Sequence, residues 1–284
     1  MEREIIVAEH AGFCPGVRRA IDIAFRAADE VNGVVYSIGP IIHNPTVIAD
    51  LDRVGVKAVD SVDEVEKGTV IIRSHGLPPE EIAKARAKGL KVIDATCPFV
   101  RKAQEYAHRL YQAGYLVVVI GDPHHPEVKG ILGHTGPEAR VASSEEDLDD
   151  MIHVERIGVV FQTTQYYLKC KRVLARLLMS ATELRIFNTM CSTSWQRQEE
   201  ALKLAERVDL MLVVGGRQSA NTQRMAEICR EKGVNCYLVE EAKDIDPEWL
   251  RGKASVGVTA GASTPQKSIE EVVARLNQLK TIPI

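Results

Sequence analysis

The chain has 284 residues, 45% of them hydrophobic, which is enough for several packed cores and more than one domain. Its 36 Lys and Arg residues nearly balance 39 Asp and Glu residues, so we expect neither a nucleic-acid binder nor a membrane-surface protein. The longest apolar runs are too short to cross a bilayer, and the first residues do not resemble a signal peptide. Six Cys without short-range pairing favour a reducing compartment, so we expect a cytoplasmic protein.

The predicted elements alternate between short apolar strands and amphipathic helices, and their order repeats. The first repeat predicts a helix after Cys14, strand 34–38, a second helix, strand 70–72, helix 79–88 and strand 91–93 before Cys97. The second predicts helix 100–110, strands 116–120 and 157–161, helix 168–178 and strand 184–187 before Cys191. The third predicts a helix ending near 207, strands 210–214 and 255–258, and helix 266–278.

The third repeat lacks a closing strand and a Cys, and residues 5–7, which run into Cys14, supply both. We therefore expect the N-terminal strand to pair with the C-terminal module. The predicted modules are 14–97, 98–191, and 192–284 together with 1–13. Alternating strands and helices imply an α/β fold of three pseudo-equivalent modules with small parallel sheets, whose ligands bind at the carboxyl ends of the strands.

Cys14, Cys97 and Cys191 each lie at the turn where the closing strand of a module ends and a helix begins. Pro15 and Pro98 suit the first helical position, which places the thiols near helix N-termini, where the macrodipole favours the thiolate. Three thiolates at equivalent turns suit an iron–sulfur cluster at the centre of the modules. Structural zinc is the nearest alternative, but it usually needs closely paired ligands such as C-x-x-C. Cys170, Cys229 and Cys236 fall within predicted elements and are expected to be buried.

Several neutral or weakly basic polar side chains follow strands and point to an anion site. Hydroxyl, amide and imidazole groups at helix N-termini can bind a phosphate-type ligand without Lys or Arg. The candidate ligands are His43, His75, His125, Ser219, Asn221 and Ser263. We interpret the other histidines as structural or exposed, with His124 open.

Glu127 follows His125 and Pro126 and is the leading candidate for proton delivery, although a Glu there can also serve the helix dipole. Thr163 and Thr164 can position a hydroxyl group or water, or cap the helix that follows. Gly215 and Gly216 lack a nucleotide-binding pattern, so no nucleotide cofactor is expected.

These motifs resemble, along the whole chain, the 4-hydroxy-3-methylbut-2-enyl diphosphate reductases of the non-mevalonate isoprenoid pathway. The matching segments are 12–17, 43–44, 74–76, 94–98, 125–128, 162–164, Cys191 with Arg197 and Gln198, 221–222 and 261–263.

The resemblance implies a three-lobed α/β fold around a 4Fe-4S cluster held by Cys14, Cys97 and Cys191. It implies that the substrate hydroxyl binds an open iron site and leaves as water, giving isopentenyl and dimethylallyl diphosphate. Glu127 is then the proton source and Thr163 orients the hydroxyl. The implied diphosphate ligands are His43, His75, His125, Ser219, Asn221 and Ser263. An external carrier such as a ferredoxin or flavodoxin would bring the electrons.

Two positions differ from the family pattern: Ala220 stands where a second Ser is common, and Thr193 with Ser194 replaces an Ala-Thr pair. Ala220 removes one diphosphate contact or leaves it to a backbone N–H. Two alternative functions remain: a quinolinate-synthase-like enzyme with three modules and a 4Fe-4S cluster, or a non-enzymatic iron–sulfur sensor. The set of His43, His75 and His125 with Glu127 favours the reductase over the first alternative. A sensor would not need a polar pocket built from all three modules.

Overall fold

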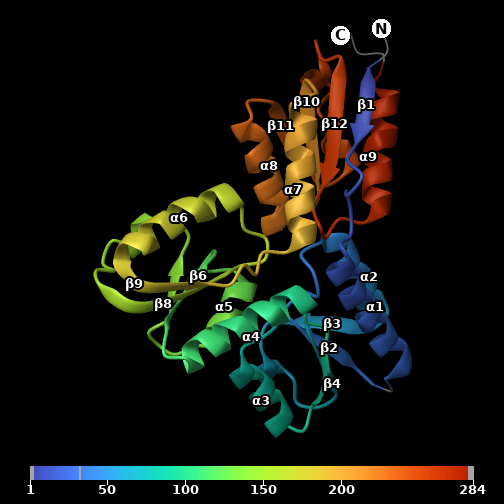
Figure 1. Cartoon of the computed structure of the whole chain (residues 1–284). Helices are drawn as coiled ribbons and strands as arrows, with labels where there is room; N and C mark the ends of the chain where they lie inside the picture. The colour runs from blue at the N-terminus through green and yellow to red at the C-terminus, as the bar shows by residue number, and fades with distance from the viewer. Residues whose placement is uncertain (1–2, 32, 281–284) are drawn as a thin grey trace. The chain divides into compact units, whose positions relative to one another are not determined.

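The computed structural model describes residues 3–31 and 33–280 and contains three parallel sheets of four strands each, with helices between the strands (Figure 1). The α/β class with small parallel sheets is therefore confirmed. The chain forms two compact units, one of residues 1–18, 42–49 and 192–284, the other of residues 19–41 and 50–191. This division is coarser than the three modules, whose boundaries stay a prediction.

The first sheet has the strand order β3-β2-β4-β5. Its strands are β2 (Val35–Ile38), β3 (Val56–Val59), β4 (Thr69–Ile72) and β5 (Lys91–Asp94). The helices of this part of the chain are α1 (Pro15–Glu30), α2 (Pro45–Arg53) and α3 (Pro79–Ala87). All four residues of β4 are buried, as expected for a central strand covered on both faces.

The second sheet has the same arrangement, with the order β7-β6-β8-β9. Its strands are β6 (Leu116–Ile120), β7 (Arg140–Ala142), β8 (Val154–Phe161) and β9 (Ala181–Ile186). The associated helices are α4 (Pro98–Gln112), α5 (Pro126–Leu132) and α6 (Tyr167–Ser180). Cys170 on α6 is 2% exposed and belongs to the apolar core of this sheet.

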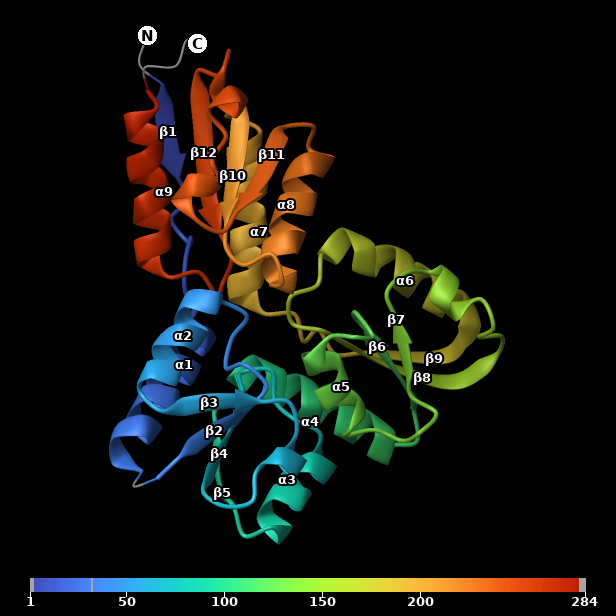
Figure 2. The same ribbon diagram turned by 180° about the vertical axis from the view of Figure 1, so that it is seen from behind.

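The third sheet has the order β1-β12-β10-β11 and includes the N-terminal strand. Its strands are β1 (Glu4–Val7), β10 (Leu210–Val214), β11 (Asn235–Val239) and β12 (Ser255–Ala260), and its helices are α7 (Ser192–Ala205), α8 (Ala220–Glu231) and α9 (Gln266–Gln278). β1 pairs in parallel with β12, with Ile5 opposite Val256, and Figures 1 and 2 show the two strands side by side. The predicted docking of the N-terminal strand is confirmed.

Arg3 fixes this permuted strand to the C-terminal part of the chain. Its buried guanidinium donates hydrogen bonds to the carbonyl oxygens of Leu250 at 2.7 Å, Lys253 at 2.9 Å and Leu279 at 3.1 Å. Because buried carbonyl groups need hydrogen-bond donors, the guanidinium completes the backbone hydrogen bonding at this end of the sheet.

The sequence pattern missed one edge strand in each sheet, namely β3, β7 and β11. These strands are three to five residues long and carry polar residues such as Lys57, Arg140 and Asn235, so the apolar alternation is weak. A short 3-10 helix follows each of them, at Val62–Glu64, Glu146–Leu148 and Ala242–Asp244. The repeated unit therefore has one strand more than the sequence indicates. The central pairs of the three sheets are β2 and β4, β6 and β8, and β10 and β12.

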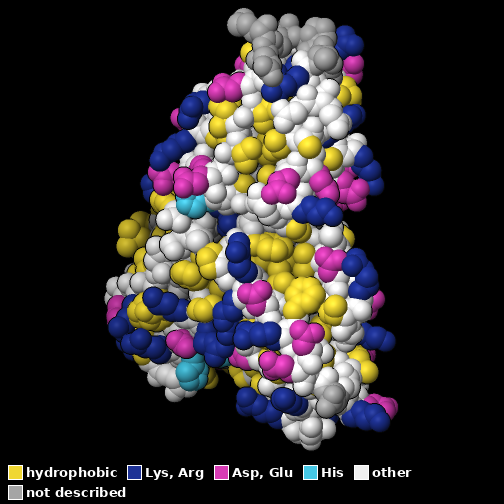
Figure 3. All heavy atoms as spheres, turned by 90° about the vertical axis from the view of Figure 1, so that its right-hand side faces the viewer, with side chains coloured by type: hydrophobic (Ala, Val, Ile, Leu, Met, Phe, Trp, Pro, Cys, Tyr) yellow, Lys and Arg dark blue, Asp and Glu magenta, His cyan; other side chains and the backbone are white. Residues whose placement is uncertain are grey.

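The surface is mixed in charge. On the face shown in Figure 3, acidic and basic side chains are interspersed, consistent with the near balance of charges in the composition. Among the described residues, no helix is long and apolar enough to cross a membrane.

Candidate functional site

The three cysteine turns share one backbone interaction. Each cysteine N–H donates a hydrogen bond to a carbonyl oxygen in the loop that follows β12, β4 or β8. The pairs are Cys14 to Ala262 at 3.2 Å, Cys97 to Ser74 at 2.9 Å and Cys191 to Thr163 at 2.9 Å. Their equivalence, inferred from the repeat, is therefore present in the hydrogen bonding.

The three thiols lie at helix N-termini and are half-buried. The Cys14 Sγ atom accepts a hydrogen bond of 3.3 Å from the N–H of Val17, in the first turn of α1. Cys97 is the N-cap residue of α4, and Cys191 directly precedes α7. Half-buried cysteines at helix N-termini are accessible to a metal, and cysteine sulfurs are the ligands of iron–sulfur clusters. The donor set therefore fits a cluster.

The other three cysteines lie in hydrophobic cores. Cys170, Cys229 and Cys236 are 2%, 0% and 6% exposed. A hydrogen bond with Cys236 raises the pKa of the Cys229 thiol, and burial raises it further. The prediction that these residues are buried is confirmed.

In the loops after β2, β6 and β10, one side chain of each loop caps the helix that follows. Asn44, His125 and Ser219 accept hydrogen bonds from N–H groups in the first turns of α2, α5 and α8. His43 lies one residue before Asn44, whereas His125 is itself the capping residue, so the two histidines do not occupy matching positions. The residues that match across modules are His125 with Ser219, and Glu127 with Asn221.

In the unit formed by residues 19–41 and 50–191, two histidines come from loops, and a carboxyl group comes from the first turn of α5. The rings of His75 and His125 lie 5.3 Å apart in an edge-to-face arrangement. Glu127 is 1% exposed and accepts two hydrogen bonds from Thr163, one of 2.6 Å from the N–H and one of 2.9 Å from the hydroxyl. Burial raises the pKa of Glu127 to about 7, although the Thr163 hydrogen bonds lower it. Near neutral pH this carboxyl can both hold and release a proton.

In the other unit, polar side chains gather at the N-terminus of α8. The Ser263 hydroxyl donates to the Ser219 hydroxyl at 3.3 Å, and Asn221 accepts a 3.5 Å hydrogen bond from Ser194. The buried Nδ2 of Asn221 has no hydrogen-bond partner among the described residues. A buried N–H donor without an acceptor is costly unless a ligand completes it, which fits an anion at this helix N-terminus.

His43 belongs to the same unit as Ser219 and lies near the loop between β10 and α8. A Cβ atom on Gly216 would stand only 3.0 Å from the carbonyl oxygen of His43, so the two loops approach closely there. Ala220 is the first residue of α8, where its backbone N–H lies among the unpaired donors of the helix terminus. The predicted ligands thus fall into two groups, one in each unit.

Sequence reasoning left no role for the polar face of α7. Ser194, Arg197 and Gln198 are buried at 4–6% exposure, and Gln198 donates to Ser194, which in turn contacts Asn221. Their spacing of three and four residues places them on one helix face, a signal that was visible in the sequence.

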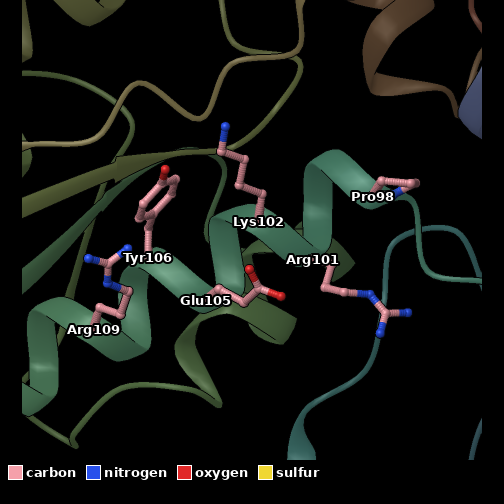
Figure 4. Close-up of a pocket in the computed structure, with 6 residues that line it drawn as sticks. All are labelled: Pro98, Arg101, Lys102, Glu105, Tyr106 and Arg109. Atoms are coloured by element: carbon pink, nitrogen blue, oxygen red, sulfur yellow. The ribbon is translucent and has the colours of Figure 1, made fainter.

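A separate hollow of about 290 Å³ lies on the outer face of α4 and is lined by Arg101, Lys102, Glu105, Tyr106 and Arg109, together with Pro98 (Figure 4). None of the predicted site residues lines it. Arg101 pairs with Asp94, whose other oxygen accepts the N–H of Thr96 beside Cys97.

A family model described as LytB protein matches residues 5–277. The chain belongs to the LytB family. Relatives named 4-hydroxy-3-methylbut-2-enyl diphosphate reductase from Pelobacter propionicus and Geobacter metallireducens are each 48% identical to it, over 97% of this chain and 98% of theirs.

Solved structures of the family agree. One of (E)-4-hydroxy-3-methyl-but-2-enyl diphosphate reductase, described as the terminal enzyme of the non-mevalonate pathway, is 43% identical, with a TM-score of 0.72, over 97% of this chain and 99% of its own. The Plasmodium falciparum reductase structure, at 24% identity, has a TM-score of 0.94 over 100% of this chain and 92% of its own, which supports the fold.

Proposed function

We propose that this LytB-family protein reductively removes the hydroxyl group of 4-hydroxy-3-methylbut-2-enyl diphosphate. The reaction consumes two electrons and two protons, breaks the allylic C–O bond and releases water, giving isopentenyl or dimethylallyl diphosphate. Identity of 48% over nearly the whole length of reductases in two bacteria supports this substrate. The family match favours the reductase over the quinolinate-synthase-like and sensor alternatives.

The observation that carries the proposal is the buried Glu127–Thr163 pair beside the loop of Cys191. Thr163 bonds Glu127 through its N–H and hydroxyl and bonds the Cys191 N–H through its carbonyl oxygen. A proton donor is thereby tied, through Thr163, to the backbone of a cysteine that suits metal binding. Reductive loss of a hydroxyl group needs that combination, because the leaving oxygen must be protonated as the bond breaks.

We further propose that the thiolates of Cys14, Cys97 and Cys191 hold a 4Fe-4S cluster. Their equivalent backbone hydrogen bonds and helix N-terminal positions support this assignment. When bound, such a cluster supplies low-potential electrons and a Lewis-acidic iron for the substrate oxygen.

The remaining residues bind and orient the substrate. His43, His75, His125, Ser219, Asn221 and Ser263 are the proposed diphosphate ligands, with the backbone N–H of Ala220 in place of a second serine. The unpartnered Nδ2 of Asn221 supports this role. Diphosphate binding at a distance from the reacting carbon holds the hydroxyl end in position, where Thr163 orients it and Glu127 gives its proton.

We propose that an external carrier such as a ferredoxin or flavodoxin brings the electrons, and that the protein works in the cytoplasm. The sequence has six cysteines without the short-range pairing of a disulfide framework, which favours a reducing compartment.

The test is anaerobic purification of the full chain with iron and sulfide analysis, then addition of the diphosphate substrate under a reduced dye. We expect iron and sulfide in the protein and formation of the two C5 diphosphates. A protein that carries the cluster yet leaves the substrate unchanged would contradict the reaction, and one without iron would contradict the cofactor.

A further inference from the structure

The segment that leads to Cys14 is held by two side chains of α7. Arg197 donates from Nε to the carbonyl oxygen of His10 and from a terminal nitrogen to that of Gly12, both at 2.6 Å. Glu200 accepts the N–H groups of Glu9 at 2.5 Å and His10 at 3.0 Å. Residues three apart share one helix face, so α7 satisfies both donors and acceptors of residues 9–12.

Burial makes the Arg197 interaction specific. Arg197 is 5% exposed, and a buried guanidinium is costly unless well-placed acceptors compensate it. If this segment had no need of a fixed position, its carbonyl groups could accept hydrogen bonds from water instead of from a buried arginine. Arginine is suited to this task because its planar donors fix two acceptors at once.

The other two cysteine turns share a local device, to which the Cys97 turn adds a 3.2 Å hydrogen bond from Arg19 to the carbonyl oxygen of Thr96. Asp94, three residues before Cys97, accepts the N–H of Thr96 at 2.8 Å. Asn188, three residues before Cys191, accepts the N–H of Met190 at 3.1 Å. Short side chains of this kind stabilise a turn by bonding the backbone two residues ahead.

The turn before Cys14 cannot use this device. The matching residue is Ala11, which has no side-chain acceptor, and the next residue, Gly12, has φ of +100°, a conformation that favours glycine. The support that Asp94 and Asn188 give locally therefore has to come from elsewhere, and Arg197 with Glu200 supply it from α7.

We propose that Arg197 and Glu200 are positioning residues that fix Cys14 for metal binding, replacing the local side-chain turn of the other two cysteines. This inference rests on the proposed function in taking Cys14 as a cluster ligand. Its effect on the backbone of residues 9–14 can be measured without any catalytic turnover.

The experiment compares Arg197→Lys and Glu200→Gln in the full-length, anaerobically purified protein. Lys keeps the charge of Arg197 but loses the two-nitrogen fork. We expect amide hydrogen exchange in residues 9–14 and loss of iron to a chelator both to accelerate roughly 10- to 100-fold, the effect of losing a hydrogen bond to a charged group. The reduced cluster should also show a changed electron paramagnetic resonance spectrum.

Matched controls come from the same helix, where Glu199 and Lys203 form an exposed pair at 2.9 Å. Glu199→Gln and Lys203→Met should leave both rates within about twofold, because exposed pairs contribute little. Protection of β10 in the module core should be the same in all variants, which separates a local effect from general destabilisation.

Unchanged exchange of residues 9–14 in both test variants would overturn the inference, as would equal acceleration in the controls. Faster exchange with normal iron retention would also overturn it, since Arg197 and Glu200 would then hold residues 9–12 without affecting metal binding at Cys14. If Arg197→Lys does not fold, Glu200→Gln decides, because Glu200 lies nearer the surface. A wild-type protein without iron would instead refute the proposed function. Hydrogen exchange would still report whether Arg197 and Glu200 hold residues 9–12.

Discussion

The second and third modules use one backbone position for opposite chemistry. The second residue of α5 is Glu127, a buried carboxyl, whereas the second residue of α8 is Asn221, a buried neutral amide. Both follow a capping residue that ends the loop after the first strand. The partner explains the difference, because Glu127 bonds Thr163, while the residue that matches Thr163 in the third module is Ala262, which has no hydroxyl group.

Asn221 instead accepts a hydrogen bond from Ser194 of α7, and its amide nitrogen has no partner among the described residues, which suits the proposed diphosphate. A carboxyl group at this point would repel a diphosphate, and an amide at the other would supply no proton. The repeat therefore fixes where the side chain lies, and the residue type decides whether it suits the proposed proton transfer or the proposed anion binding.

The largest expected effect concerns what the modules share, the cysteine turns. Cys14→Ser, Cys97→Ser and Cys191→Ser should each lose the intact cluster, since a hydroxyl group is a poor substitute for a thiolate. Cys170→Ser, Cys229→Ser and Cys236→Ser should keep it and lose only stability. Iron content and visible absorbance decide, and normal iron in any of the first three variants would end the three-ligand model.

Glu127→Gln tests the proton role of the second module. The amide keeps size and hydrogen bonding to Thr163 but cannot deliver a proton, so turnover should fall by roughly 10²–10⁴. If the side chain served only the helix dipole, the cost would be about 0.3–1 kcal/mol of stability. Substrate binding should persist, visible as a substrate-dependent change in the Mössbauer spectrum. Near-normal turnover would leave Thr163 or a water as the proton route.

The same carboxyl should make stability depend on pH. Its pKa is raised from 4.5 to about 7 by burial, so the folded protein holds this proton more tightly than the unfolded chain. The stabilisation is present in full below about pH 4.5 and is lost as the pH rises through 7, on the order of 3 kcal/mol. Glu127→Gln should remove this part of the pH dependence of the unfolding free energy. Parallel curves for both proteins between pH 5 and 8 would mean that Glu127 stays ionised.

The sequence predicted much of the fold because central strands such as β10 are continuous apolar runs and the cysteine turns repeat. Strand β1 was assigned correctly because the third repeat lacked its last strand. Strand β7 was not found, since three residues, one of them Arg140, give no measurable alternation.

For Cys14, Glu127 and Asn221 the residue type alone indicated the proposed chemistry, and their roles stay predictions. The role proposed for Arg197 was not predictable, because it depends on bonds to residues 185 and 187 positions away in the chain. The raised pKa of Glu127 likewise follows from burial, which no local pattern reports.

Asn221→Asp sharpens the comparison from the third module, since it places a carboxyl group where the second module has one. The change removes the Nδ2 donor and adds negative charge to the anion site, so KM for the diphosphate should rise at least about tenfold, the worth of one hydrogen bond to a charged group. Turnover at saturation should change less. Asn235→Asp, on the exposed start of β11, adds the same charge as a control. Equal KM values in the two variants would remove Asn221 from the diphosphate site.

The smallest expected effect comes from Ala220, the first residue of α8. A serine there could add one hydroxyl donor beside Ser219, and a neutral hydrogen bond contributes roughly 0.5–1.5 kcal/mol. Ala220→Ser should therefore lower the dissociation constant of the substrate by about two- to tenfold, with little change in turnover, as measured by titration of the anaerobic protein. The helix terminus already offers backbone N–H groups, so the hydroxyl adds to existing donors and does not create the site. Weaker binding by a normally folded variant would show that the loop before α8 turns this side chain away from the diphosphate. The chemistry of the third module would then depend on its backbone and on Asn221.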